Sequence, residues 1–205
     1  MDTGWLAGVL GFAFAMAATP GPNNTIAAAS GARHGMARSL PLMAGIAVGV
    51  ASIMLATAAF GASLVADPAV GRVLKWAGIV YLSWLAWTIA NATPSPVDTD
   101  GPGAAGTAPT SFAQGAFLQL VNPKLWVMVG GAVVTYGGAE AGAGRVTLSV
   151  LFALIFGGMT FASTLAWAAL GASIGRFLAT RRAMRAFNIL MAALLLASLV
   201  PVLVG

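Results

Sequence analysis

The chain has 205 residues, of which 59% are apolar and 7% charged, with a net charge of +5. An ordinary soluble domain has about 25% charged residues, so this chain could not give a soluble core a polar coat. The positive excess lies in a few arginines at the ends of apolar runs, without the basic stripe and interleaved aromatics of a nucleic-acid binder, and no nucleic-acid partner is expected.

Six apolar segments are long enough to cross a bilayer, for which about 20 residues are needed. They cover residues 4–32, 41–66, 71–91, 112–136, 146–172 and 185–204. The first is expected to be retained as a span, because its start carries Asp2 and no Lys or Arg, unlike a signal peptide. We therefore expect an all-α, polytopic membrane protein with six transmembrane helices and membrane lipid as a partner.

The first span is interrupted by "TPGPNN", residues 19–24. Pro20 and Pro22 lack an N–H and clash with the preceding turn, so a continuous helix is broken here. Proline suits the first turn of a helix, and Pro22 is expected to start a second half-helix. Its free N–H groups form a positive site suited to a carboxylate. The alternative is a simple proline kink, in which the asparagines only satisfy freed backbone groups.

Two further features follow the first span. The basic segment 33–40, with the single histidine His34, is expected to be a loop. Gly45 and Gly49 in the second span, and Gly171 and Gly175 at the end of the fifth, have a spacing that favours close packing of helix backbones.

A polar segment rich in proline and glycine, residues 92–111, separates residues 1–91 from residues 112–205. We interpret it as a cytoplasmic linker between two halves of three spans each. An odd number of spans makes the second half enter the membrane from the opposite side. If the halves are repeats, they are therefore inverted repeats, as in many secondary transporters.

The fourth span contains the counterpart of the first break, in "QLVNPKLW" from Gln119 to Trp126. Pro123 interrupts this helix, between Asn122 and Lys124. Matched proline breaks in the first helix of each half indicate a transporter's binding site.

Lys124 lies roughly 18 Å into the fourth span if that helix begins near Phe112, at about 1.5 Å per residue. A lysine at that depth is costly and is a functional candidate. The alternative is a side chain that reaches the interface from near a helix end.

Orientation follows from the distribution of Lys and Arg. The loops after the first and fifth spans hold the larger group, Arg33, Arg38, Arg176, Arg181, Arg182 and Arg185. The opposite side holds Arg72, Lys75 and Arg145. This bias predicts that the arginine-rich loops are cytoplasmic and that both termini lie outside, in the periplasm.

Several chemistries have no support in the sequence. With no cysteine and no carboxylate squarely inside a span, neither a metal site nor a cofactor is expected. Hydrolase, metalloprotease and nucleotide-binding motifs are absent, so the chain is not expected to be an enzyme. A cation or metal-ion exporter of related fold, a non-transporting scaffold and a channel remain alternatives.

The motif "TPGPNN" followed by "SGARHGMARSLPLMAGIAVG" resembles the first-span signature of the LysE/RhtB family of bacterial amino-acid exporters. "LKWAGIVYLSWLAW" is similar to that family's third span and "QGAFLQLVNPKLWVMV" to its Asn-Pro-Lys segment, so the resemblance covers about residues 8–130. After Lys124 the chain departs from the family pattern. The resemblance implies a multi-pass inner-membrane exporter of an amino acid or related metabolite, driven by an ion gradient, with a proton antiporter as the expected type.

We expect alternating access to a substrate site between the two breaks, and a homo-oligomer is possible. The expected substrate-binding residues are Thr19, Pro20, Gly21, Pro22, Asn23, Asn24, Gln119, Asn122, Pro123 and Lys124.

Overall fold

A computed structural model of the chain describes residues 3–60, 68–91, 111–137, 143–175, 180–197 and 199–200. All regular structure in these ranges is helical, as the sequence predicts. The helices are α1 (Thr3–Ala18), α2 (Pro22–Phe60), α4 (Pro68–Ala90), α5 (Phe112–Leu118), α6 (Pro123–Tyr136), α7 (Ala143–Gly175) and α8 (Arg181–Ala197), with a 3-10 turn, η1 (Gln119–Val121), between α5 and α6.

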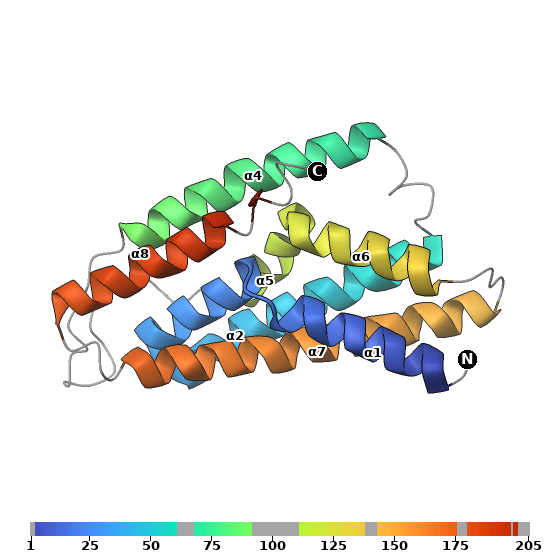
Figure 1. Cartoon of the computed structure of the whole chain (residues 1–205), viewed down its shortest axis with the longest axis horizontal. Coiled ribbons are helices and arrows are strands. Elements are labelled where there is room, and N and C mark those ends of the chain that lie inside the picture. The colour runs from blue at the N-terminus through green and yellow to red at the C-terminus, as the bar shows by residue number, and fades with distance from the viewer. Residues whose placement is uncertain are drawn as a thin grey trace.

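The helices form an elongated bundle in which successive passes run in opposite directions (Figure 1). The first pass is α1 continued by the start of α2, and the pass made of α5, η1 and α6 is interrupted in a similar way (Figure 1). α7 packs along α2 and α1, whereas α4 and α8 lie side by side (Figure 1). The inverted relation of the two halves stays a prediction, and the linker lies outside the described residues except for Ser111.

The expected loop at residues 33–40 is absent, and this prediction is wrong. Helical structure continues through His34, and Gly35 alone leaves helical angles, with φ 75° and ψ 170°. A positive φ is accessible to glycine without the steric cost that a side chain brings. Ser39 donates a hydrogen bond to the Gly35 carbonyl at 2.9 Å, and its hydroxyl is 2.7 Å from that of Ser30. The chain thus reverses direction at a single residue, at one end of the molecule (Figure 1).

Length and composition mark two of the described helices as able to cross a membrane, Pro22–Phe60 and Gly144–Ile174. A third crossing is obtained when Phe112–Val121 and Pro123–Tyr136, which meet at an angle of 66°, are counted together. α2 has 39 residues, or nearly 60 Å at about 1.5 Å per residue, twice a typical hydrocarbon thickness. The turn at Gly35 is what allows so long a helical stretch to fold back on itself. That the chain has six spans stays a prediction.

Close backbone contacts hold α2 against its neighbours. A Cβ added to Gly31 would overlap the Ala168 carbonyl of α7, and one added to Gly171 would overlap the Ala28 carbonyl of α2. The same reciprocal arrangement joins α2 to α5, where Gly45 meets the Phe112 carbonyl. The close packing predicted at Gly45 and Gly171 is therefore confirmed.

The part of the bundle near the N-terminus is packed with aromatic side chains instead. Trp5 stacks on Phe152 at a centroid distance of 6.1 Å and donates a hydrogen bond to the Tyr136 carbonyl at 3.2 Å. Phe12 meets Phe156 edge-on at 6.1 Å. This cluster ties the N-terminal part of α1 to α6 and α7.

Candidate functional site

The site is built where α1 ends and α2 begins. Thr19, Pro20 and Gly21 separate the two helices, and α2 starts at Pro22, as the sequence predicts. The last carbonyls of a helix have no partner within the helix and carry partial negative charge. The first N–H groups of the next helix carry the opposite partial charge. The break therefore places a negative and a positive helix end next to each other.

Side chains from α2, α6 and α7 donate hydrogen bonds to carbonyls at the end of α1. Asn24 donates to the carbonyls of Ala17 and Thr19, at 2.7 and 3.0 Å. Ser163 of α7 donates to the Ala17 carbonyl at 2.8 Å. The Lys124 ammonium donates to the Thr19 carbonyl at 2.7 Å, across 105 residues of sequence. Lys124 is thus directed at the negative end of α1.

The second break lies at Asn122. Its side chain caps α6 by accepting from the Lys124 N–H at 3.1 Å, and Pro123 occupies the first turn. The Trp126 indole donates to the Leu120 carbonyl at 2.8 Å, which closes the other side of the bend. Since a proline at the first helical position lacks only a donor that would be unused, the residue order Asn-Pro-Lys accounts for the start of α6.

The two breaks are joined by a cluster of side-chain amides. Asn23 donates to the Gln119 oxygen at 3.1 Å, and Gln119 donates back to the Asn23 oxygen at 3.0 Å. The Asn122 amide donates to both of these oxygens at 3.2 Å. Gln119 and Asn122 are almost completely buried. These amides satisfy one another and hold α2 against the start of α6.

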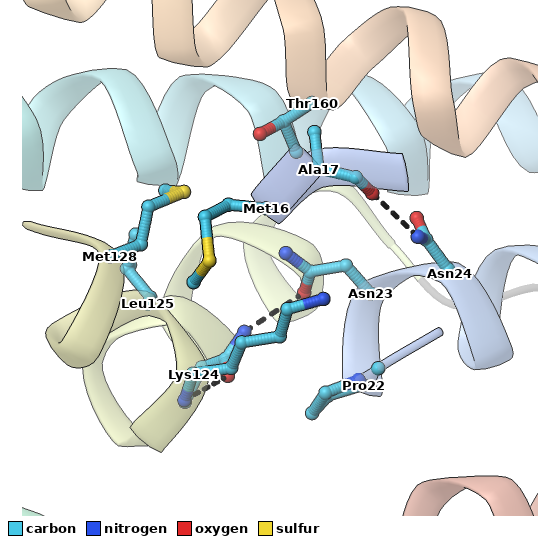
Figure 2. A pocket seen from close by; sticks show the side chains of 11 residues that line it. Met16, Ala17, Pro22, Asn23, Asn24, Lys124, Leu125, Met128 and Thr160 are labelled. Carbon is cyan, nitrogen blue, oxygen red and sulfur yellow. Dashed lines mark hydrogen bonds between the residues drawn. The ribbon is translucent and has the colours of Figure 1, made fainter. Parts of the chain in front are cut away.

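A small cavity lies beside this cluster, with a volume of about 30 Å³. That is room for about two water molecules, so an amino acid could enter only if side chains move. The lining residues come from α1, α2, α6, α7 and the two breaks: Met16, Ala17, Gly21, Pro22, Asn23, Asn24, Asn122, Lys124, Leu125, Met128 and Thr160. In Figure 2, Met16, Leu125 and Met128 lie on one side, and Pro22 and Asn24 on the other.

Lys124 lies over Gly21. A Cβ added to Gly21 would be 2.8 Å from Cδ and 3.0 Å from Nζ of Lys124. The absence of a side chain at residue 21 therefore gives Lys124 the space to reach the Thr19 carbonyl.

Most of the residues expected at the site come together. Gly21, Pro22, Asn23, Asn24, Asn122 and Lys124 line the cavity. The others stand outside the lining: Thr19 contributes its carbonyl, Gln119 lies behind Asn23, Pro123 is buried in the first turn of α6, and Pro20 is exposed. Sequence reasoning missed five residues at the site, because each is an ordinary small or apolar residue of a membrane helix: Met16, Leu125, Met128, Thr160 and Ser163.

Within the described residues, no group of three or more His, Asp or Glu side chains is placed to hold a metal ion. The lining of the cavity contains one charged side chain, Lys124, and several amides, which suits an organic zwitterion better than a metal cation.

A protein-family model, described as LysE type translocator, matches residues 14–202. The cysteine/O-acetylserine efflux protein of Escherichia coli strain K12 is 40% identical over 151 residues, which cover 71% of this chain and 74% of the relative. The protein of the same name from Escherichia coli O157:H7 is 38% identical over 183 residues, which cover 88% of each chain. No solved structure matches the chain.

Proposed function

Because the chain belongs to the LysE type translocator family, we propose that it exports small amino acids and closely related metabolites, with cysteine and O-acetylserine as the first candidates. The family match bears out the resemblance found in the sequence, and the class of function is transport rather than catalysis. The chain is a multi-pass membrane protein. The two candidate substrates come from the names of the relatives, at about 40% identity.

One observation carries the proposed site: two oppositely charged helix ends meet at a cavity beside a lysine. We place the substrate carboxylate at the first turn of α2, near Pro22 and Asn23, where N–H groups and the helix dipole favour an anion. The substrate ammonium lies at the end of α1, where the Thr19 carbonyl already accepts from a cation. In other transporter folds, an interrupted helix likewise directs the N-terminus of a half-helix at an anionic substrate group and backbone carbonyls at a cation.

Lys124 takes part in binding both the ammonium and the carboxylate of the substrate. In the empty site its ammonium occupies the Thr19 carbonyl, which the substrate ammonium needs. A bound amino acid displaces it, and the freed lysine turns toward the substrate carboxylate. Lys124 is long and flexible and lies half-buried at the cavity, so this movement also supplies part of the missing volume.

The remaining features belong to the same proposal. The protein is a secondary-active carrier of the bacterial inner membrane, with six spans in two inverted halves and both termini in the periplasm. The halves rock about the amide cluster, and a proton gradient drives export. The paired breaks and the arginine distribution support this arrangement.

The test is transport of labelled cysteine and O-acetylserine into everted vesicles, with and without a proton gradient. Lys124→Gln removes the charge and is expected to lower transport efficiency about 10- to 100-fold, as for loss of a hydrogen bond to a charged group. Arg182→Gln, an exposed arginine of α8, is the matched control and keeps normal transport. If the wild-type protein moves neither compound, the proposed function is wrong; if Lys124→Gln transports normally, only the site is wrong.

A further inference from the structure

We propose that the Thr160 hydroxyl, in a cavity that Met16 and Met128 also line, forms the subsite for the substrate side chain. It selects short, uncharged side chains that carry a hydrogen-bond acceptor. The inference rests on the proposed function. That function places the substrate carboxylate and ammonium at the two helix ends, and the inference assigns the remaining part of the cavity to the substrate side chain.

Thr160 is a buried polar residue whose hydroxyl is unused. The residue is 5% exposed, and in the described ranges only its main-chain carbonyl takes part in a hydrogen bond, from Thr164 at 2.9 Å. No described side-chain polar atom that is shut off from solvent lacks a partner. The free hydroxyl of Thr160 therefore opens onto the cavity that the residue lines (Figure 2).

Its neighbour on the same helix face has a different role. Ser163 lies three residues further along α7 and is committed to the Ala17 carbonyl and to the Asn24 oxygen, at 2.8 and 3.2 Å. α7 thus fixes the end of α1 with one hydroxyl and presents the other to the cavity. Because this hydroxyl opens onto the cavity, a ligand acceptor at this point replaces cavity water and makes a hydrogen bond that an apolar group cannot make.

The other side chains at this end set the size and polarity of the subsite. Met16, Leu125 and Met128 gather on one side of the cavity (Figure 2). Methionine is unbranched and polarisable, so it can move aside for a small group and still pack against it. Among the described residues that line the cavity, Lys124 alone is charged, and as proposed above it serves the substrate carboxylate. A charged side chain would therefore find no counter-charge from these residues at the Thr160 end.

The acetyl ester of O-acetylserine meets these requirements, with a carbonyl oxygen two bonds beyond the side-chain oxygen. The thiol of cysteine is a weaker acceptor. Norvaline, with an unbranched apolar side chain, leaves the hydroxyl unpaired once water is displaced. The subsite therefore binds the ester more tightly than the hydrocarbon.

Binding is measured with purified protein in detergent, as the rise in unfolding temperature during titration with O-acetylserine or norvaline. The quantity compared is the ratio of the two dissociation constants. Thr160→Val, which is nearly isosteric, is expected to reduce the preference for O-acetylserine about tenfold. Thr160→Ser keeps the hydroxyl and the preference. Thr164→Val is the matched control, since the Thr164 hydroxyl bonds only to its own helix, at the carbonyls of Thr160 and Phe161.

An unchanged ratio in Thr160→Val, or an equal loss in Thr164→Val, overturns the subsite. If Thr160→Val does not fold, the ratio for Thr160→Ala decides the same question. A wild-type protein that no amino acid stabilises would contradict the proposed function itself, which keeps the two failures distinct.

Discussion

Gly21 is the residue on which the position of Lys124 depends. Replacing it with alanine puts a Cβ within 2.8 Å of the lysine side chain, which must move away from the Thr19 carbonyl. Because the colliding atoms belong to a flexible side chain, Gly21→Ala is expected to fold. Its KM for transport should fall about tenfold, because the displaced lysine no longer competes with the substrate ammonium for the Thr19 carbonyl. Gly11→Ala is the control, since nothing lies within 4 Å of a Cβ there; an equal KM in both variants would contradict the placement of Lys124.

The reciprocal amide pair of Asn23 and Gln119 makes a second prediction at this scale. A double-mutant cycle with Asn23→Ala and Gln119→Ala should give a coupling free energy of unfolding of about 0.6–1.7 kcal/mol, the range for hydrogen bonds between membrane helices. The measurement is unfolding in mixed micelles. Asn23 and Gln114 provide the comparison, because Gln114 is exposed and bonds with Ser111. A coupling no larger for Gln119 than for Gln114 would rule out the cross-link.

At the residue scale, the sequence predicted the polar side of the site and missed the apolar side. Prolines inside a hydrophobic run destabilise a continuous helix, so prolines and asparagines there indicate a break and are easily recognised in the sequence. Met16 and Thr160 do not stand out, because methionine and threonine are common in membrane helices. The mutual pairing of Asn23 and Gln119 depends on tertiary contact across 96 residues, which one sequence does not reveal.

Among the elements, α2 and α7 cross with their backbones in contact, so an added side chain finds no room there. Gly171→Ala forces a methyl group into the Ala28 carbonyl, which is backbone and cannot turn away. We expect a loss of about 1–3 kcal/mol in stability, seen as a lower unfolding temperature in detergent. Gly158→Ala on the same helix has open space around its Cβ and should be neutral or slightly stabilising. Similar unfolding temperatures for the two variants would disprove the close crossing.

Two of the boundaries set by proline followed from the sequence. α2 begins at Pro22 as expected, and the interruption expected at Pro123 is where α6 begins. Pro41 was expected to begin a span and lies inside α2. The turn at Gly35 was wrongly expected to be a loop, because a basic segment with glycine is typical of loops. In the structure one glycine with positive φ replaces eight loop residues, and Ser39 stabilises it through the Gly35 carbonyl.

For the whole molecule, the prediction concerns its orientation in the membrane, with the arginine-rich loops in the cytoplasm and both termini in the periplasm. The chain lacks cysteine, so single cysteines can be introduced without background. Arg182→Cys should react with an impermeant maleimide only in everted vesicles, and Thr3→Cys only in right-side-out cells; both positions are exposed. The unaltered chain is the control and should not react. The reverse pattern would place the termini in the cytoplasm and invert the proposed direction of every span.

The two ends of the bundle are packed in different ways, one through glycine contacts and the other through aromatic side chains. The sequence predicted only the first kind, because glycine spacing indicates the close contacts of Gly45 and Gly171. The aromatic cluster around Trp5 and Phe152 could equally have been interface anchors, since aromatic residues are common at membrane boundaries. Only the helix arrangement decides that these rings face each other.

The hydrogen bond from Lys124 to the Thr19 carbonyl also constrains how the protein is made. Its partners are 105 residues apart, and those of the Asn23–Gln119 pair 96. At about 5–20 residues per second, a ribosome needs roughly 5–20 s to add that much chain. During this interval the first break sits in or near the bilayer with a backbone carbonyl and an amide still awaiting their partners. Nascent chains stalled before residue 119 should therefore be the ones that membrane quality-control proteases remove, and those extended past Lys124 the ones that survive.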